Sequence, residues 1–132
     1  MIDKSFKKLI ENSSNIVVFT GAGISTESGI PDFRSPTGIW KKYQPIEFSD
    51  FLSSETVRLE AWRRKFEIDK NISKAMPNIG HIAIAKLVKS GKVKNVITQN
   101  IDNLHQESGI PNDIIIEMHG NTTYAKCLDC GF

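Results

Sequence analysis

The stretch GAGISTESGIPDFRSPTGIW, residues 21–40, decides the fold of this chain. It directly follows NIVVFT, residues 15–20, a continuous β-branched and apolar run that predicts a buried strand. Dinucleotide-binding turns place glycines in the pattern G-x-G-x-x-G after such a strand. Gly21 and Gly23 fit this pattern, whereas the third position is Thr26. The stretch therefore indicates a phosphate-binding turn of a variant kind, and a plain strand-ending turn is an equally good interpretation of the two glycines alone.

The second half of this stretch favours the binding interpretation. An acid, an aromatic ring and a guanidinium follow one another at Asp32, Phe33 and Arg34. Surface loops rarely carry a phenylalanine between two charges, and these three residues cannot all be core. We expect a flap that shields a ligand ring, with Arg34 on a phosphate or an acidic partner. Long loops such as 21–45 are uncommon unless they are functional, and we expect one helical turn in it after Gly23.

The rest of the chain alternates helices with strands. Strands alternating with helices predict an α/β fold with a parallel, doubly wound, Rossmann-like sheet and a helical insertion after its first unit. We expect helices after Asp3, over 47–74, over 78–91 with Asn78 as its cap, and over 101–109, and further strands over 93–100 and 113–120.

Two of the predicted helices carry apolar positions at helical spacing. The N-terminal helix has Phe6, Leu9 and Ile10. The longer helix is expected to bury a ragged apolar face opposite its arginines and lysines. That face comprises Val57, Leu59, Trp62, Phe66 and Ile68.

Composition limits the class of protein. The 132 residues suffice for one domain, and 39% hydrophobic with 24% charged residues is globular rather than disordered. A formal net charge of +2 is too small to indicate a nucleic-acid or anionic-membrane partner. No apolar run approaches a membrane span, and charges stand where a signal peptide needs an apolar stretch. We therefore expect a cytoplasmic chain with no direct nucleic-acid or membrane partner.

Polar residues lie at the ends of the second and third predicted strands. Gln99, Asn100 and Asp102 offer amide and carboxylate groups to ribose hydroxyls or a carboxamide at a strand end, where open α/β sheets bind ligands. Asn100 or Asp102 can also cap the following helix. His119 ends the third strand on the same side, which makes a general base plausible, although a lone histidine is more often structural. His81 and His105 lie on predicted helices and are assigned to packing or capping.

The chain has two cysteines, Cys127 and Cys130, in one C-x-x-C. In a reducing compartment this spacing indicates metal binding or redox chemistry before a structural disulfide. Structural zinc sites use four ligands, usually two such pairs, so one pair alone is an incomplete site.

Taken in order, GAGISTESGIPDFRSPTGIW, TQNIDNLHQESG, EMHGN and CLDC resemble the sirtuin family of NAD-dependent protein deacylases. The resemblance covers nearly the whole chain from residue 14 on. It implies a deacylase that transfers an acyl group from lysine to ADP-ribose with release of nicotinamide. The partners implied are NAD and an acetyl-lysine protein, with a structural zinc held in part by the cysteine pair.

The resemblance also implies roles for individual residues. His119 would be the general base on a ribose hydroxyl, and Asn100 and Asp102 would share the catalytic site. NAD would contact residues of both loops. These residues are Gly21, Ala22, Gly23, Ser25, Asp32, Phe33, Arg34, Trp40, Gln99, Asn100, Ile101 and Asp102.

Against the family pattern, the second cysteine pair, the adenosine-binding strands and the peptide-pairing strand are missing, so the sequence is expected to be the N-terminal half of a catalytic domain. Its parts would be a Rossmann-like part (1–46 and 91–122), a helical insertion (47–90) and the start of a zinc module (123–132). A half sheet should expose an edge and apolar surface. In the family, deacylases that prefer acidic acyl groups carry a tyrosine and an arginine three apart on the helix that faces the acyl pocket. The stretch EAWRRKFEIDK has Trp62 and Arg63 but no tyrosine, so the resemblance implies neutral acyl groups.

Two other functions fit the same motifs. An ADP-ribosyltransferase would break the same bond with a different nucleophile, and no residue of the chain separates it from a deacylase. A non-catalytic, truncated NAD-binding module is the alternative outside the enzymes. A nucleic-acid-binding zinc ribbon is disfavoured by the near-neutral charge and the single C-x-x-C.

Overall fold

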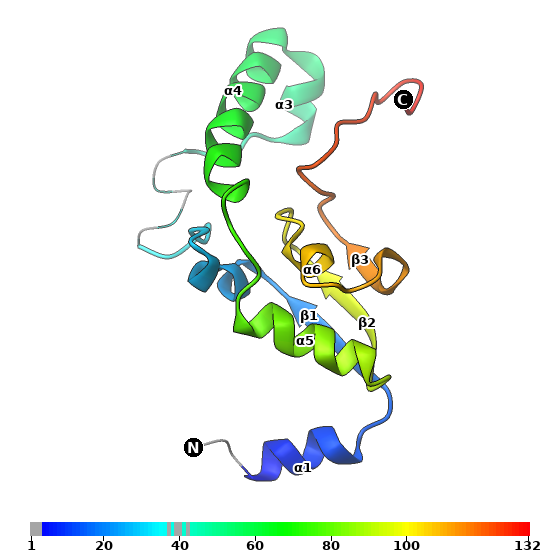
Figure 1. Cartoon of the computed structure of the whole chain (residues 1–132). Helices are drawn as coiled ribbons and strands as arrows, with labels where there is room; N and C mark the ends of the chain where they lie inside the picture. Colours follow the sequence, from blue (N-terminus) through cyan, green and yellow to red (C-terminus); the bar gives the residue numbers. More distant parts are fainter. Residues whose placement is uncertain (1–3, 37, 39–40, 42) are drawn as a thin grey trace.

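The computed structural model describes residues 4–36, 38, 41 and 43–132. Its centre is a three-stranded sheet in the order β1 (Ile16–Thr20), β2 (Val93–Thr98) and β3 (Ile115–Glu117), and both pairings are parallel. The three carboxyl ends therefore meet at one edge, as Figure 1 shows. The predicted α/β fold with a parallel sheet is confirmed.

Helices and short 3-10 turns connect these strands. In chain order they are α1 (Lys4–Asn12), η1 (Ala22–Ser28), α3 (Phe48–Ser53), α4 (Glu55–Ile72), α5 (Ile79–Lys89), α6 (Leu104–Glu107) and η2 (Asn112–Ile114). The helix predicted over 47–74 is two helices, because Ser54 has an extended backbone and its Oγ accepts the Val57 amide as the cap of α4. The predicted cap Asp3 lies outside the described residues.

Helix α5 covers one face of the sheet. Its half-buried Ile84, Leu87 and Val88 pack with the fully buried Val93 and Val96 of β2. Asn78 caps this helix as predicted, since its side chain accepts the Gly80 amide. Because α5 belongs to the sheet layer, only α3 and α4 of the predicted insertion stand away from the strands (Figure 1).

The opposite face of the sheet is left largely exposed by the described residues. Side chains alternate between the faces of a strand, so Val17 and Phe19 point away from α5. Each is 58% exposed, and Ile116 on β3 is 49% exposed. Parallel sheets are normally covered on both faces, and the expected apolar surface of a half sheet is therefore present.

The long helix α4 leaves most of its predicted buried apolar face exposed. Leu59 and Phe66 are 65% and 59% exposed, and Trp62 stacks at a tilt beside Phe66. Only Val57 and Ile68 of the predicted face are half-buried. The helix α1 buries none of its residues. No helix of the described residues is long and apolar enough to cross a membrane.

Candidate functional site

A cavity of about 540 Å³ lies at the carboxyl edge of the sheet. The segment after β1, the segment after β2 and the residue that follows β3 by two positions all contribute to it. Its lining residues are Gly21, Ala22, Gly23, Asp32, Phe33, Arg34, Gln99, Asn100, Ile101 and His119. All of them are residues that the sequence pointed to. Trp40 lies outside the described residues, and Ser25 and Asp102 are buried nearby.

The glycines of the first loop are explained by space rather than by backbone conformation. Gly21 is extended, with φ −131°, and within the described part of this loop positive φ occurs at Gly29, where it closes η1. A Cβ added to Gly23 would meet no atom within 4 Å. The fold itself therefore tolerates a side chain there, and the open space at Gly23 suits a ligand that approaches the backbone closely.

Three polar side chains form a buried network at the base of the cavity. The Ser25 hydroxyl donates to Asp102 Oδ2 at 2.6 Å, and Asn100 Nδ2 donates to Ser25 Oγ at 3.2 Å and to the Gly21 carbonyl at 3.1 Å. Asp102 Oδ1 accepts the Leu104 amide, the first of α6, so Asp102 supports the start of this helix although the N-cap residue is Asn103. The network ties the turn after β1 to the segment after β2.

His119 reaches the same cavity from the end of β3. Its Nδ1 lies 2.9 Å from the Gln99 carbonyl oxygen. A carbonyl oxygen only accepts, so Nδ1 carries the proton in this arrangement. Neutral His119 then has its free lone pair on Nε2, which is the arrangement that a general base needs.

Contacts within the flap itself fix its conformation. Asp32 Oδ1 accepts the Ser35 amide at 3.1 Å, which fixes the turn that presents Phe33. A Cβ on the buried Gly38 would lie only 2.6 Å from the Phe33 carbonyl carbon. Asp32 thus has a structural role besides lining the cavity, and Gly38 is a residue that the sequence interpretation missed.

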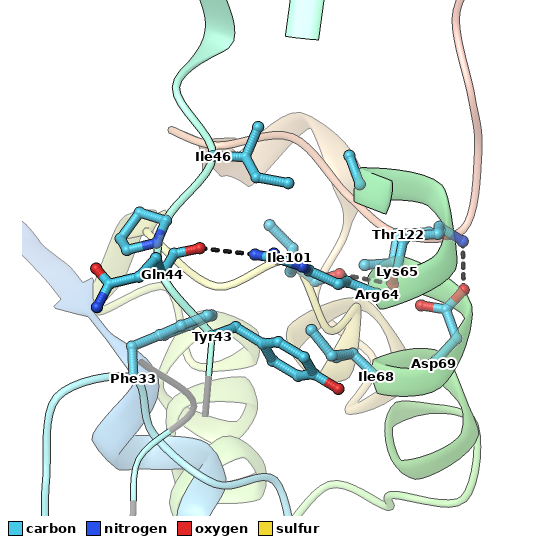
Figure 2. Close-up of a pocket in the computed structure, with 12 residues that line it drawn as sticks. Phe33, Tyr43, Gln44, Ile46, Arg64, Lys65, Ile68, Asp69, Ile101 and Thr122 are labelled. Carbon is cyan, nitrogen blue, oxygen red and sulfur yellow. Dashed lines mark hydrogen bonds and ion pairs between the residues drawn. The ribbon is translucent and has the colours of Figure 1, made fainter. Parts of the chain in front are cut away.

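A second pocket of about 250 Å³ lies between this flap and α4 (Figure 2). Phe33 and Ile101 line both pockets, so their side chains form the shared wall. The far side comes from α4, where Arg64 donates to the Gln44 carbonyl at 2.7 Å and Lys65 pairs with Asp69. The lining is otherwise mainly apolar.

The cysteine pair does not form a complete metal site. Cys127 and Cys130 are exposed thiols on a turn that the Gly131 amide closes by donating to the Cys127 carbonyl. The Cys130 amide, followed by the Asp129 amide, lowers the pKa of the Cys127 thiol. Within the described residues no three histidine, cysteine or acidic side chains lie close enough to share a metal ion. Two thiols alone do not fit a closed tetrahedral zinc site.

Comparison with known proteins identifies the family of this chain. The sequence profile of the Sir2 family matches residues 21–132. The chain belongs to the Sir2 family. Resemblance to sirtuins, expected from four sequence motifs, is thereby confirmed.

Relatives within the Sir2 family share most of this sequence. The NAD-dependent protein deacetylase of Rhodopseudomonas palustris is 58% identical over 123 residues, which cover 93% of this chain and 49% of that protein. The NAD-dependent protein deacylase of Pyrococcus furiosus is 45% identical over 95% of this chain and 49% of its own length. The chain thus spans about half the length of the curated relatives it matches.

Solved Sir2 structures share the fold. One, a Sir2 variant with a deacetylated p53 peptide and 3'-O-acetyl ADP-ribose, superposes with a TM-score of 0.88 at 42% identity. It matches 99% of this chain and 52% of its own. Another, Sir2 with a p53 peptide and NAD⁺, gives 0.81 at 38% identity over 99% of this chain and 51% of that one.

Proposed function

We propose that this Sir2-family chain carries the NAD-binding and base-bearing half of an NAD-dependent protein lysine deacylase. The reaction would transfer an acyl group from lysine to ADP-ribose and release nicotinamide. The single observation that carries the proposal is the convergence of His119 with the Asn100, Ser25 and Asp102 network on one cavity. The names of the relatives, NAD-dependent deacetylases and deacylases, support the same reaction class.

The residues of the cavity fit NAD. Its volume is within the range of ligand sites, and the open space at Gly23 leaves the backbone of η1 accessible to a diphosphate. Arg34 lines the same cavity and would add a cation near the phosphates. Bound NAD would supply the glycosidic bond to nicotinamide, whose cleavage makes a ribose carbon open to attack by the acyl oxygen.

Each polar group then has a task in that reaction. The amide of Asn100, oriented by Gly21 and Ser25, and the carboxylate of Asp102 would border the nicotinamide and its ribose. The Gln99 carbonyl holds His119 with Nε2 free, and Nε2 would take a proton from a ribose hydroxyl so that the acyl group can migrate. Phe33 would shield the reacting centre from water.

Zinc has no part in these steps. Cys127 and Cys130 would contribute half of a tetrahedral site, and a complete one would need two more ligands that the described residues do not supply. From the resemblance to sirtuins we also propose the division into a Rossmann-like part (1–46 and 91–122), a helical insertion (47–90) and the start of a zinc module (123–132), with α5 of the insertion packed on the sheet. We further propose an acetyl-lysine protein as substrate, neutral acyl groups as preferred, and no nucleic-acid or membrane partner in a cytoplasmic setting.

The proposal is tested with the chain alone and with a chimera that joins it to the second half of the Rhodopseudomonas relative. Each is incubated with NAD and an acetyl-lysine peptide, and nicotinamide and deacetylated peptide are measured by mass spectrometry. We expect turnover by the chimera and a loss of about 10²–10⁴-fold in His119→Ala, with NAD binding retained. The control is Met118→Leu, which changes the exposed neighbour of His119 and should leave turnover unchanged.

The same assay separates the alternatives. Nicotinamide release from labelled NAD without an acyl peptide, with label on protein, would identify an ADP-ribosyltransferase. NAD binding without turnover in the chimera would identify a binding module. Deacetylation by His119→Ala at the unmodified rate would refute the role of His119.

A further inference from the structure

A chain of buried hydrogen bonds continues from the base of the cavity into the core. The backbone amide of Asn100 donates to Thr98 Oγ1 at 3.0 Å, and Thr98 Oγ1 accepts from Thr20 Oγ1 at 2.9 Å. Thr20 Oγ1 in turn lies 2.8 Å from His105 Nε2. The chain crosses from the end of β2 to the end of β1 and on to α6. Thr98 and His105 lie within the motif TQNIDNLHQESG and Thr20 ends the first predicted strand, but none of the three is assigned to the site from the sequence.

The contact with Thr20 selects a tautomer of His105. With Thr20 Oγ1 donating to Thr98 Oγ1, the tautomer that satisfies the contact is the one with hydrogen on Nε2 of His105. Its side chain is 1% exposed, and its Nδ1 has no hydrogen-bond partner within the described structure. A buried polar ring with one nitrogen unpaired is costly, and its retention in the core calls for a compensating role.

A second buried histidine braces His105 from α5. The rings of His81 and His105 meet edge to face with centroids 5.1 Å apart. His81 Nδ1 accepts the Asn78 amide in the cap of α5, and the Asn78 side chain donates to the Ile24 carbonyl and to Ser28 Oγ on η1. The start of α5 thus holds both the glycine loop and His105.

Both histidines are kept neutral by their surroundings. Burial, followed by His81, lowers the pKa of His105 to about 4, while the Asp102 carboxylate acts in the opposite direction. Burial also lowers the pKa of His81, again against Asp102. A neutral ring keeps its single Nε2 proton for Thr20, so the hydrogen-bond chain has the same direction throughout the neutral pH range.

We propose that Thr20 and His105 are positioning residues that hold Asn100, and through it Ser25 and Asp102, in the geometry that the nicotinamide side of NAD requires. Neither residue lines the cavity, and their side chains act on Asn100 through Thr98. Asn100 receives two independent restraints, its backbone amide on Thr98 and its side chain on Gly21 and Ser25. Loss of the restraint on its backbone amide should let the Asn100 side chain move relative to Gly21 and Ser25. The link to NAD rests on the proposed function, whereas the restraint on Asn100 does not.

The test uses matched substitutions in the 132-residue chain. Thr20→Val keeps the shape of the side chain and removes the hydroxyl, Thr20→Ser restores it, and Thr56→Val makes the same change on the exposed surface of α4. The first readout is the set of backbone and side-chain amide NMR resonances of Asn100 without ligand. The second is the dissociation constant for NAD by calorimetry.

We expect Thr20→Val to shift both sets of Asn100 resonances and to weaken NAD binding about 5-fold, the effect of one hydrogen bond. Thr20→Ser should restore both, and Thr56→Val should change neither. Unshifted Asn100 resonances in Thr20→Val, or equal shifts in Thr20→Ser, would overturn the proposal. Thr98→Val against Thr98→Ser repeats the comparison at the accepting atom, should Thr20→Val not fold. If the unmodified chain fails to bind NAD, the proposed function fails in this chain while the resonances still decide the positioning role.

Discussion

Acidification should destabilise this fold through His105. The ordinary histidine pKa of 6.5 applies in the unfolded chain, whereas the folded chain holds His105 near 4 because the ring is buried beside His81. Below pH 6.5 the unfolded state therefore binds a proton that the folded state does not. The contribution of neutral His105 to the free energy of unfolding is fully present above about pH 6.5 and is lost as the pH decreases toward 4.

The size of this effect follows from the two pKa values. By proton linkage, the free energy of unfolding should fall by about 2.5 kcal/mol between about pH 7 and about pH 4.5. This loss is on the order of half the stability of a small domain. His81, whose pKa burial also lowers, should add to the loss. The assay is urea unfolding followed by circular dichroism at both pH values.

Substitution separates His105 from the carboxylates that titrate in the same range. His105→Gln removes the titrating ring, so its stability should fall less between the two pH values than that of the unmodified chain, by about 2 kcal/mol. If the free energy of unfolding of His105→Gln fell with pH as steeply as that of the unmodified chain, His105 would not be the group responsible.

Three further predictions concern the flap, the bare sheet face and the cysteine pair. Gly38→Ala should change the free energy of NAD binding by more than the free energy of unfolding, because its Cβ would displace the backbone of Phe33; calorimetry and thermal unfolding check this. Phe19→Lys should reduce self-association measured by light scattering, whereas Phe48→Lys on α3 should reduce it less, since only Phe19 lies on the uncovered sheet. The dialysed chain should hold well below one zinc by elemental analysis, and a stoichiometric, chelator-resistant zinc would contradict the incomplete site.

The sequence predicted the sheet well because local patterns determine it. Local sequence patterns mark its elements: apolar runs begin at residues 15 and 93, Asn78 caps one helix and Gly109 ends another. Prediction was weaker where neighbours decide the outcome. The stripe of Leu59 and Phe66 has the spacing of a core face, yet nothing in the described chain covers it.

The lining of the cavity was predicted from motifs, and the support behind it was not. Thr20 and Thr98 are ordinary strand residues by pattern, and only the register that pairs them across β1 and β2 brings their hydroxyls together. The assignment of His105 to packing was confirmed by its burial, but its bond to Thr20 needed the tertiary structure. Hydrogen bonds between residues 78 or 85 positions apart leave no local trace in a sequence.

The same parallel register explains why half of a Sir2 fold still assembles a recognisable site. Every described side chain assigned to the proposed chemistry lies in a segment that follows β1, β2 or β3, and the parallel pairing brings the carboxyl ends of those strands to one edge. The restraints that orient them, from Thr98 to Asn100 and from Gln99 to His119, are also internal to these strand ends. The orientation of His119, the proposed general base, is therefore a property of this half, whereas the exposed face at Val17 and Phe19 marks where the fold needs a covering layer for stability.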